Sequence, residues 1–457
     1  MPIGDLLPEI VVLLGAVGCL LMALALPLRA QTAGALLAIA CCLAAVMLAW
    51  RAPAGAHASF AGHLMIDEAT RIGRLTVLTI TAAAAALAPS WFEGDRRHGE
   101  YYALLLLATL AAMLLAATTD IAMLLVTVLF GSACAYVLAA YHRAWAPSVE
   151  AGMRLFLIGA VSNTLMALGT VLVLGMAGHT SFTALAAMPA IAPLTGIGIA
   201  LIMLGLLFEL GAPPAHAWVP DVTQHAPLPS VAFLTIAPKV AAAIALARLL
   251  GAMPDAGAAA APAMLALSVI AMTGGNLLAL VQRDARRLIG WSSIAQAGYA
   301  LIAMTAIGRD ATAMAALLSF LIAYAVSNLA VLAVIAHWRG RTTAVELAGM
   351  GRQMPISAAV LIAALFSLVG IPPLAGFVGK FGLFRLALDN GQVWLAIAGI
   401  ANSALSLAAY ARLFVPIVFG TARSEALTLG RAPAMVVAIT GAGLLVVAAL
   451  AASLLAR

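Results

Sequence analysis

The sequence predicts an all-α integral membrane protein with about fourteen transmembrane helices, two pseudosymmetric five-helix repeats, and breaks in helices seven and twelve. Hydrophobic residues make up 65% of the 457 residues and charged residues only 9%, which excludes an ordinary soluble protein. The apolar residues form runs long enough to cross about 30 Å of hydrocarbon. Two of these runs contain the same Gly-x-Pro-Pro element, and paired prolines interrupt a helix.

The apolar runs are separated only by short polar gaps. Because no gap is long enough for an extramembrane domain, residues 1–457 are predicted to form a single polytopic membrane domain. Approximate bounds of the fourteen runs are 6–28, 33–50, 71–92, 101–117, 120–140, 149–176, 193–219, 229–250, 262–281, 286–306, 312–338, 355–389, 392–416 and 432–455.

Arginines predict the orientation of the runs in the membrane. Positive side chains concentrate on the cytoplasmic side of membrane proteins, so the gaps with most arginines are predicted to be cytoplasmic and both termini to lie outside. The odd-numbered gaps hold Arg29, Arg96, Arg97, Arg143, Arg283, Arg286, Arg287, Arg339, Arg341, Arg352, Arg423 and Arg431. The even-numbered gaps hold little beyond Arg51 and Arg309.

Two sets of matched elements predict an internal duplication. The Gly-x-Pro-Pro elements begin at Gly211 and Gly370, 159 residues apart. An Ala-x-Ala-Arg-Leu element follows each, with its arginine at Arg248 and Arg412, 164 residues apart. Repeat one is therefore predicted at about 101–250 and repeat two at about 262–416. Transporters built from repeats place ion sites at corresponding broken helices.

The two lysines of the chain are its most informative polar residues. Only Lys239 and Lys380 among twenty-three basic residues are lysines, and both lie inside apolar runs. Charging a lysine there costs at least about 2.5 kcal/mol, so an intramembrane lysine is a functional candidate. Lysine can also release its proton when desolvated, whereas arginine cannot. Both are therefore predicted to handle protons or small cations. The structural alternatives are a polar contact with another subunit for Lys239 and a snorkelling side chain for Lys380.

Glu209 and Arg154 are the other candidate site residues. Glu209 immediately precedes the Gly211 break, where a buried carboxylate can hold a proton or pair with a cation. Arg154 cannot carry protons, so its predicted role is electrostatic tuning. We expect all four candidates to point inward at similar depth, with Glu209 facing Arg154 or Lys239. A fixed Glu209–Arg154 ion pair is the structural alternative.

Other chemistries have no support in the sequence. There is no nucleotide-binding loop, haem-ligand pair, cysteine cluster or catalytic triad, so we expect no redox chemistry and no bound cofactor on this chain. His216 and His225 do not have the spacing of a usual metal site and are interpreted as loop contacts. No polybasic run exists, which argues against a nucleic-acid partner.

Three long motifs follow one another along the chain. They are Phe208–Leu210 with Pro214–Val222 and Ala226–Pro229, then Arg286–Tyr299, then Gly370–Phe381. Together they resemble motifs of the antiporter-like membrane subunits of the respiratory complex I family. Within this family, the length, the fourteen runs and the single lysine of the last motif favour the subunit N type, the counterpart of mitochondrial subunit 2.

The resemblance assigns positions to the candidate residues. It implies that Lys239 and Lys380 are the family's helix-eight and helix-twelve lysines, and that Arg154 stands where helix six usually has lysine. Two positions depart from the pattern. Leu129 replaces a helix-five carboxylate, and Glu209 replaces the helix-seven lysine that pairs with it.

The resemblance also implies a function. The chain would be a non-catalytic, proton-translocating subunit of a complex I-type membrane arm in a bacterial inner membrane. Lys239 would be the central carrier and Lys380 the transfer site. Partner subunits would carry flavin and iron–sulfur clusters and drive the movement of protons or Na⁺ by electron transfer. The alternatives are a non-pumping scaffold, which Leu129 motivates, and a subunit of a cation/proton antiporter or of a membrane-bound hydrogenase.

Overall fold

The structure is a computed structural model of the chain, and it describes residues 3–27, 30–52, 55–93, 98–187, 192–339, 341–421 and 431–455. The predicted cytoplasmic residues Arg29, Arg96, Arg97 and Arg423 lie outside these ranges.

Nearly all described residues are helical, which confirms the predicted all-α class. The only sheet is a hairpin in which β1 (His57–Ser59) pairs antiparallel with β2 (Leu64–Ile66) within the described ranges. In the N-terminal half the helices are η1 (Ile3–Leu6), α1 (Leu7–Ala25), α2 (Ala33–Arg51), η3 (Phe60–Gly62), α3 (Glu68–Trp91), α4 (Gly99–Ala117), α5 (Ile121–Ala139), α6 (Ala146–Ala177), α7 (Phe182–Ala186), α8 (Pro193–Leu210), α9 (Trp218–His225), α10 (Leu228–Leu234) and α11 (Ala237–Ala252). In the C-terminal half they are α12 (Pro254–Leu280), α13 (Ala285–Met304), α14 (Ala313–His337), α15 (Ala344–Leu347), α16 (Met350–Gln353), α17 (Pro355–Val369), α18 (Ala375–Asp389), α19 (Val393–Phe419) and α20 (Arg431–Leu455).

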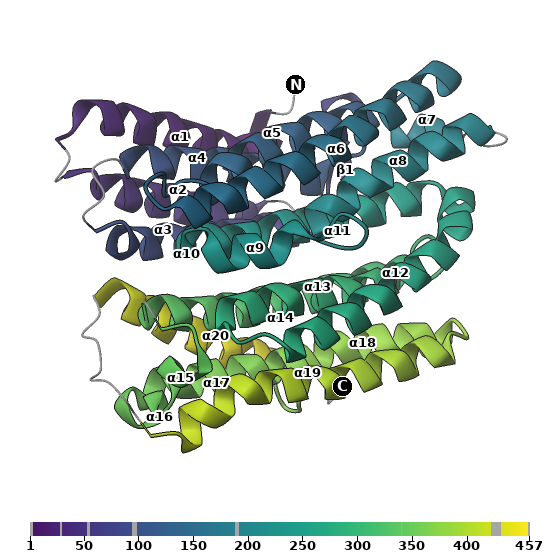
Figure 1. The fold of residues 1–457 in the computed structure, drawn as a ribbon. Helices are drawn as coiled ribbons and strands as arrows, with labels where there is room; N and C mark the ends of the chain where they lie inside the picture. Colours follow the sequence, from purple (N-terminus) through teal and green to yellow (C-terminus); the bar gives the residue numbers. More distant parts are fainter. Residues whose placement is uncertain are drawn as a thin grey trace.

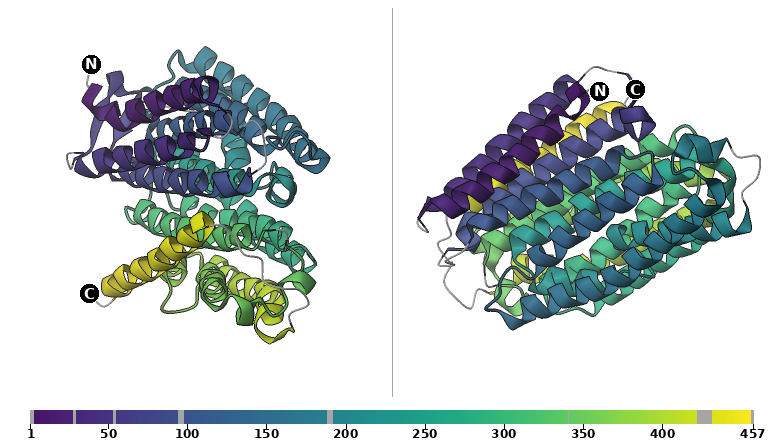
Figure 2. Two further views of the ribbon diagram at one scale, coloured as in Figure 1. Left: turned by 90° about the vertical axis from the view of Figure 1, so that its left-hand side faces the viewer. Right: turned by 90° about the horizontal axis from the view of Figure 1, so that it is seen from above.

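The helices gather into two halves that follow the chain. Figure 1 shows α1–α11 on one side and α12–α20 on the other. Helices α3, α10 and α11 contact α14 across the boundary between the halves. Helix α20, yellow in Figure 2, runs obliquely over the C-terminal half and packs on α14 and α3. The boundary is therefore formed by packed helices from both halves.

Eleven described helices are long and apolar enough to cross a membrane, or up to twelve if one bent pair is a single span. The predicted count of fourteen therefore stays a prediction. Two of the fourteen predicted runs explain part of the difference. Helix α13 carries polar residues along its length, and the broken segment 355–389 divides into α17 and α18, each of 15 residues.

Both predicted helix breaks are present. Helix α8 ends at Leu210 and α17 at Val369, and each is followed by a glycine with positive φ, Gly211 at 68° and Gly370 at 93°. Glycine is the residue that adopts this left-handed conformation at low cost after a helix. The Pro213–Pro214 and Pro372–Pro373 peptide bonds are both cis.

A third break was not predicted. The sequence indicated one continuous run over 229–250, but α10 ends at Leu234 and α11 begins only at Ala237. Pro238 is the physical reason, because its ring excludes the carbonyl four residues earlier, that of Leu234. Lys239 follows directly, so the break places the lysine at the start of a helix.

Ion pairs fix the N-terminal helices to the rest of the bundle. The Arg74 Nε atom lies 2.7 Å from Glu9 Oε1, and both side chains are almost fully buried. Asp67, which caps α3 ahead of its membrane span, accepts from Arg248 Nη1 at 3.0 Å and Nη2 at 2.5 Å. Burial raises the pKa of Asp67, but hydrogen bonds and charge from Arg248 outweigh it, so the pKa lies below its usual value.

The buried Glu9–Arg74 pair gives a stability prediction. Glu9→Leu leaves the Arg74 guanidinium buried without its counter-charge and is expected to destabilise the fold by about 3 kcal/mol. The double variant Glu9→Leu/Arg74→Met removes both charges and is expected to recover most of that loss. Thermal unfolding of the three proteins in one detergent is the measurement. A single variant as stable as the wild type would contradict the prediction.

Candidate functional site: buried lysines at helix breaks

Lys239 lies at the start of α11, and its side chain reaches the turn between α8 and α9. Its side chain is 3% exposed, and Nζ donates to the Ser293 carbonyl oxygen at 2.7 Å. A Cβ placed on Gly211 would lie 3.6 Å from Nζ, so the ammonium group reaches the first broken helix. The ring of Tyr324 is 5.7 Å from Nζ. The lysine is thus held by a carbonyl and an aromatic ring.

Lys380 lies in the second turn of α18, with its side chain against the break between α17 and α18, and is also 3% exposed. Its Nζ donates to the Val369 carbonyl oxygen at 3.1 Å and to Ser403 Oγ at 3.3 Å. Val369 is the last residue of α17, and its carbonyl lacks an intrahelical partner because the helix ends there. Tyr299 places its ring centroid 3.8 Å from Nζ. The break therefore supplies an acceptor for the second lysine.

Hydroxyl groups lead from one lysine towards the other. Ser293, whose carbonyl accepts from Lys239, also places Oγ 2.9 Å from Tyr324 Oη. Tyr324 Oη donates to the Thr235 carbonyl at 2.8 Å, at the break between α10 and α11. Tyr324 also lines a small cavity of about 10 Å³, room for about one water molecule, that Lys380 borders. The remaining lining residues are Gln296, Phe320, Ala323, Ser367, Leu368 and Gly376.

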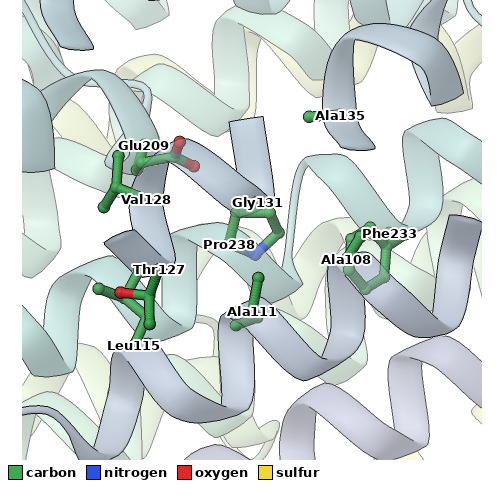
Figure 3. A pocket seen from close by; sticks show the side chains of 11 residues that line it. Ala108, Ala111, Leu115, Thr127, Val128, Gly131, Ala135, Glu209, Phe233 and Pro238 are labelled. Atoms are coloured by element: carbon green, nitrogen blue, oxygen red, sulfur yellow. The ribbon is translucent and has the colours of Figure 1, made fainter. Parts of the chain in front are cut away.

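Glu209 is buried, but its partner is a hydroxyl and not a base. Its Oε1 accepts from Ser132 Oγ on α5 at 2.7 Å. Two small cavities, of about 20 and 10 Å³, adjoin the carboxylate, and Pro238 lines both. Figure 3 shows the larger one, with Glu209 at its edge beside Val128. Among the described residues Glu209 forms no ion pair, so the expected direct pairing with Arg154 or Lys239 is wrong.

Arg154 does not point inward as expected. Half of its side chain is exposed, and it pairs with Glu150 and Asp221, each at 2.5 Å. Asp221 also pairs with Arg287 at 2.6 Å. Glu150 is four residues before Arg154 on α6, so the helix itself supplies an exposed counter-charge, and α9 supplies a second one. Arg154 therefore joins α6 to α9 and stands apart from the two lysines.

This geometry predicts a mild effect at Arg154. Arg154→Lys keeps the charge and loses one of the two ion pairs of a half-exposed side chain, so proton movement is expected to stay within about twofold of wild type. Proton uptake into vesicles containing the assembled complex is the measurement. A much larger loss would return Arg154 to the proton path.

Leu129 lies on α5 and is 42% exposed on the outside of the fold. Ser132, three residues further along the same helix, makes the contact with Glu209 instead. Sequence reasoning missed Ser132 and the tyrosines Tyr299 and Tyr324. The signal that could have found the tyrosines is their position inside apolar runs, where a hydroxyl needs a partner.

His216 and His225 each lie beside a tryptophan ring. The His216 ring lies 6.1 Å from the Trp291 ring, and the His225 ring 6.0 Å from the Trp145 ring. Across the described residues, no three His, Cys, Asp or Glu side chains are grouped to hold a metal ion.

The arrangement agrees with what comparisons with known proteins find. Residues 118–406 match the family model described as the membrane part of NADH:quinone oxidoreductase/Mrp antiporter subunits. NADH-quinone oxidoreductase subunit N of Mycobacterium sp. (strain JLS) is 36% identical, covering 78% of this chain and 76% of the relative. The same subunit of Rhodospirillum rubrum is 33% identical, covering 92% and 88%. A chain of respiratory complex I from Thermus thermophilus superposes with a TM-score of 0.83 at 28% identity, with 97% of each chain covered. The chain is therefore a multi-pass membrane protein of the NADH:quinone oxidoreductase/Mrp antiporter subunit family.

Proposed function

We propose that the chain is the proton-translocating, antiporter-like subunit of a complex I-type membrane arm. Lys239 is the central proton carrier and Lys380 the transfer site, while electron transfer in partner subunits provides the free energy. The observation that carries this proposal is the pair of buried lysines at two helix breaks, joined by hydroxyls and a cavity. Within the described residues neither lysine has a carboxylate partner, so each can gain or release a proton without breaking an ion pair.

Glu209 belongs to the same proposed path. Its carboxylate occupies the first broken helix two residues before Gly211, and the cavities beside it reach Pro238, the neighbour of Lys239. A proton held on Glu209 would lower the local negative charge and so favour release of a proton from Lys239, because charges interact strongly in a medium of low dielectric constant.

The duplication is part of this proposal, with repeat one at about 101–250 and repeat two at about 262–416. Several local features support it. Asp120 caps α5 and Asp284 caps α13, each accepting from the amide three residues on. Each aspartate also forms an isolated antiparallel bridge, Asp120 to Ser181 and Asp284 to Thr343. Each repeat then contributes one broken helix and one buried lysine, Lys239 in the first repeat and Lys380 in the second.

The partners and the location follow from the same proposal. The chain would assemble with other membrane-arm subunits in a bacterial inner membrane, with both termini outside, and those partners would hold the flavin and iron–sulfur clusters. The transported ion is assigned as the proton, because the side chains of Lys239, Lys380 and Glu209 can each gain and release a proton. The ammonium groups of the two lysines are hydrogen-bond donors only and cannot act as ligands for Na⁺.

Lys380→Met tests the proposal. The assembled complex carrying this variant is expected to oxidise its substrate while taking up fewer protons into vesicles, because methionine cannot carry a proton. Arg385→Met is the matched control: it removes a cation from the same helix, but the Arg385 side chain is 74% exposed. Normal uptake by Lys380→Met would instead support a non-pumping scaffold, and uptake replaced by ²²Na⁺ flux would support cation/proton exchange.

A further inference from the structure

The buried side chain of Lys380 has no counter-ion in the part of the chain that the structure describes. Lys380 has no carboxylate partner among the described residues, and its two hydrogen-bond acceptors are neutral. A buried ammonium group needs compensation for the water that it loses. The ring face of Tyr299 also contacts Nζ, with its centroid 3.8 Å away.

The geometry holds that ring against the lysine. The Tyr299 hydroxyl donates to the Gly399 carbonyl of α19 at 3.1 Å and lies 3.1 Å from Ser403 Oγ, the same hydroxyl that accepts from Lys380. The rings of Phe320 and Phe384 each lie 6.2 Å from the Tyr299 ring. The edge of the ring is thus tied to α19 while its face is presented to Nζ.

We propose that Tyr299 is a positioning residue that takes the place of a counter-ion for Lys380, by presenting the negative face of its ring to the ammonium group. A ring face attracts a cation within about 6 Å, most strongly where both are desolvated. Because this attraction acts on the ammonium and not on the neutral amine, Tyr299 sets how readily Lys380 holds its proton. The inference rests on the proposed function only for its role in transport.

In the described part of the chain, the charged side chains of the helices around Lys380 make their contacts elsewhere: Arg286 with Thr223, Arg287 with Asp221, Arg385 with Asp389 and Arg412 with Leu280, while His337 lies at the end of α14. Helices α13, α14, α17, α19 and α20 pack around α18. Tyr299 of α13 lies against Nζ of Lys380, Tyr324 of α14 lines the cavity beside this lysine, and Tyr410 of α19 is bound to Ser292. Helix α17 has no titratable residue, and neither has α20 between Ala432 and Val447. The Tyr324 ring is 5.7 Å from Lys239, which makes it a weaker version of the same contact.

The sequence allows a direct test, because the chain contains only two lysines. Labelling the full chain with [¹⁵Nζ]lysine gives two signals, which Lys239→Met and Lys380→Met assign. Solid-state NMR in nanodiscs then follows each signal from ammonium to amine as pH rises. Removing the ring by Tyr299→Leu is expected to move the midpoint of the Lys380 signal about one pH unit lower. Tyr299→Phe keeps the ring and is expected to leave the midpoint unchanged.

The Lys239 signal and the variant Phe384→Leu are the two controls. The Lys239 signal should keep its wild-type position in every Tyr299 variant, which shows that the bundle is folded. Phe384→Leu removes a ring that touches Tyr299, and should leave the Lys380 midpoint in place. An unshifted Lys380 midpoint in Tyr299→Leu would overturn the proposal, and so would an equal shift in Tyr299→Phe, which would assign the effect to the hydroxyl. Neither result depends on pumping, so failure of this inference and failure of the proposed function are separate outcomes.

Discussion

Replacing Lys239 by methionine is expected to reduce proton movement through this subunit by about a hundredfold, which is the contribution of a positioned proton-transfer group. Methionine fills a similar volume but cannot accept a proton or donate to the Ser293 carbonyl. The fold should survive, because the surrounding α11 is apolar and the substitution removes a buried cation without leaving a charged partner behind. Proton uptake by vesicles containing the assembled complex is the measurement.

Lys239→Arg separates charge from proton exchange. Arginine keeps a cation at the site but does not release its proton. Proton uptake as low as that of Lys239→Met is expected. Uptake near that of the wild type would show that only a fixed positive charge is needed, and would contradict the role of Lys239 as a carrier.

Glu209→Gln is expected to give the second largest loss, about tenfold or more in proton uptake. Glutamine has the shape of glutamate and can still accept from Ser132 Oγ, so the packing around the two cavities should be preserved. What it loses is the ability to hold and release a proton. Thermal unfolding should be close to that of the wild type, because no buried cation is left without its counter-charge.

Glu68→Gln is the matched control for Glu209→Gln. Glu68 is an exposed carboxylate at the start of α3 that pairs with Arg71, away from both lysines. It is expected to leave proton uptake unchanged. Full uptake in Glu209→Gln would show that the buried carboxylate is structural, and would assign proton loading of Lys239 to other groups.

Sequence reasoning predicted the features whose cost in a membrane is large. Few surroundings within a membrane stabilise a lysine or a proline pair. The burial of Lys239 and Lys380 and the helix breaks after Leu210 and Val369 could therefore be predicted. The break before Lys239 was missed, although Pro238 signals it, because the surrounding run is uniformly apolar.

The partners of the charged residues could not be predicted in the same way. Glu209 was expected to face Arg154 or Lys239, but the sequence does not give the rotation of one helix against its neighbours. Helix α6 turns Arg154 outward to Glu150 and Asp221, while α8 turns Glu209 towards Ser132 of α5. Hydroxyl and ring contacts such as those of Tyr299 and Tyr324 depend on residues far apart in the chain and leave no local pattern.

The central claim is that protons pass through this chain by way of Lys239 and Lys380. The most direct test is the number of protons translocated per electron by the assembled complex, measured for the wild type, Lys239→Met and the double variant Lys239→Met/Lys380→Met. The ratio is expected to fall in Lys239→Met while electron transfer continues, and the second substitution is expected to cause no further fall, because both lysines serve one path. A ratio equal to that of the wild type in the double variant would contradict the account.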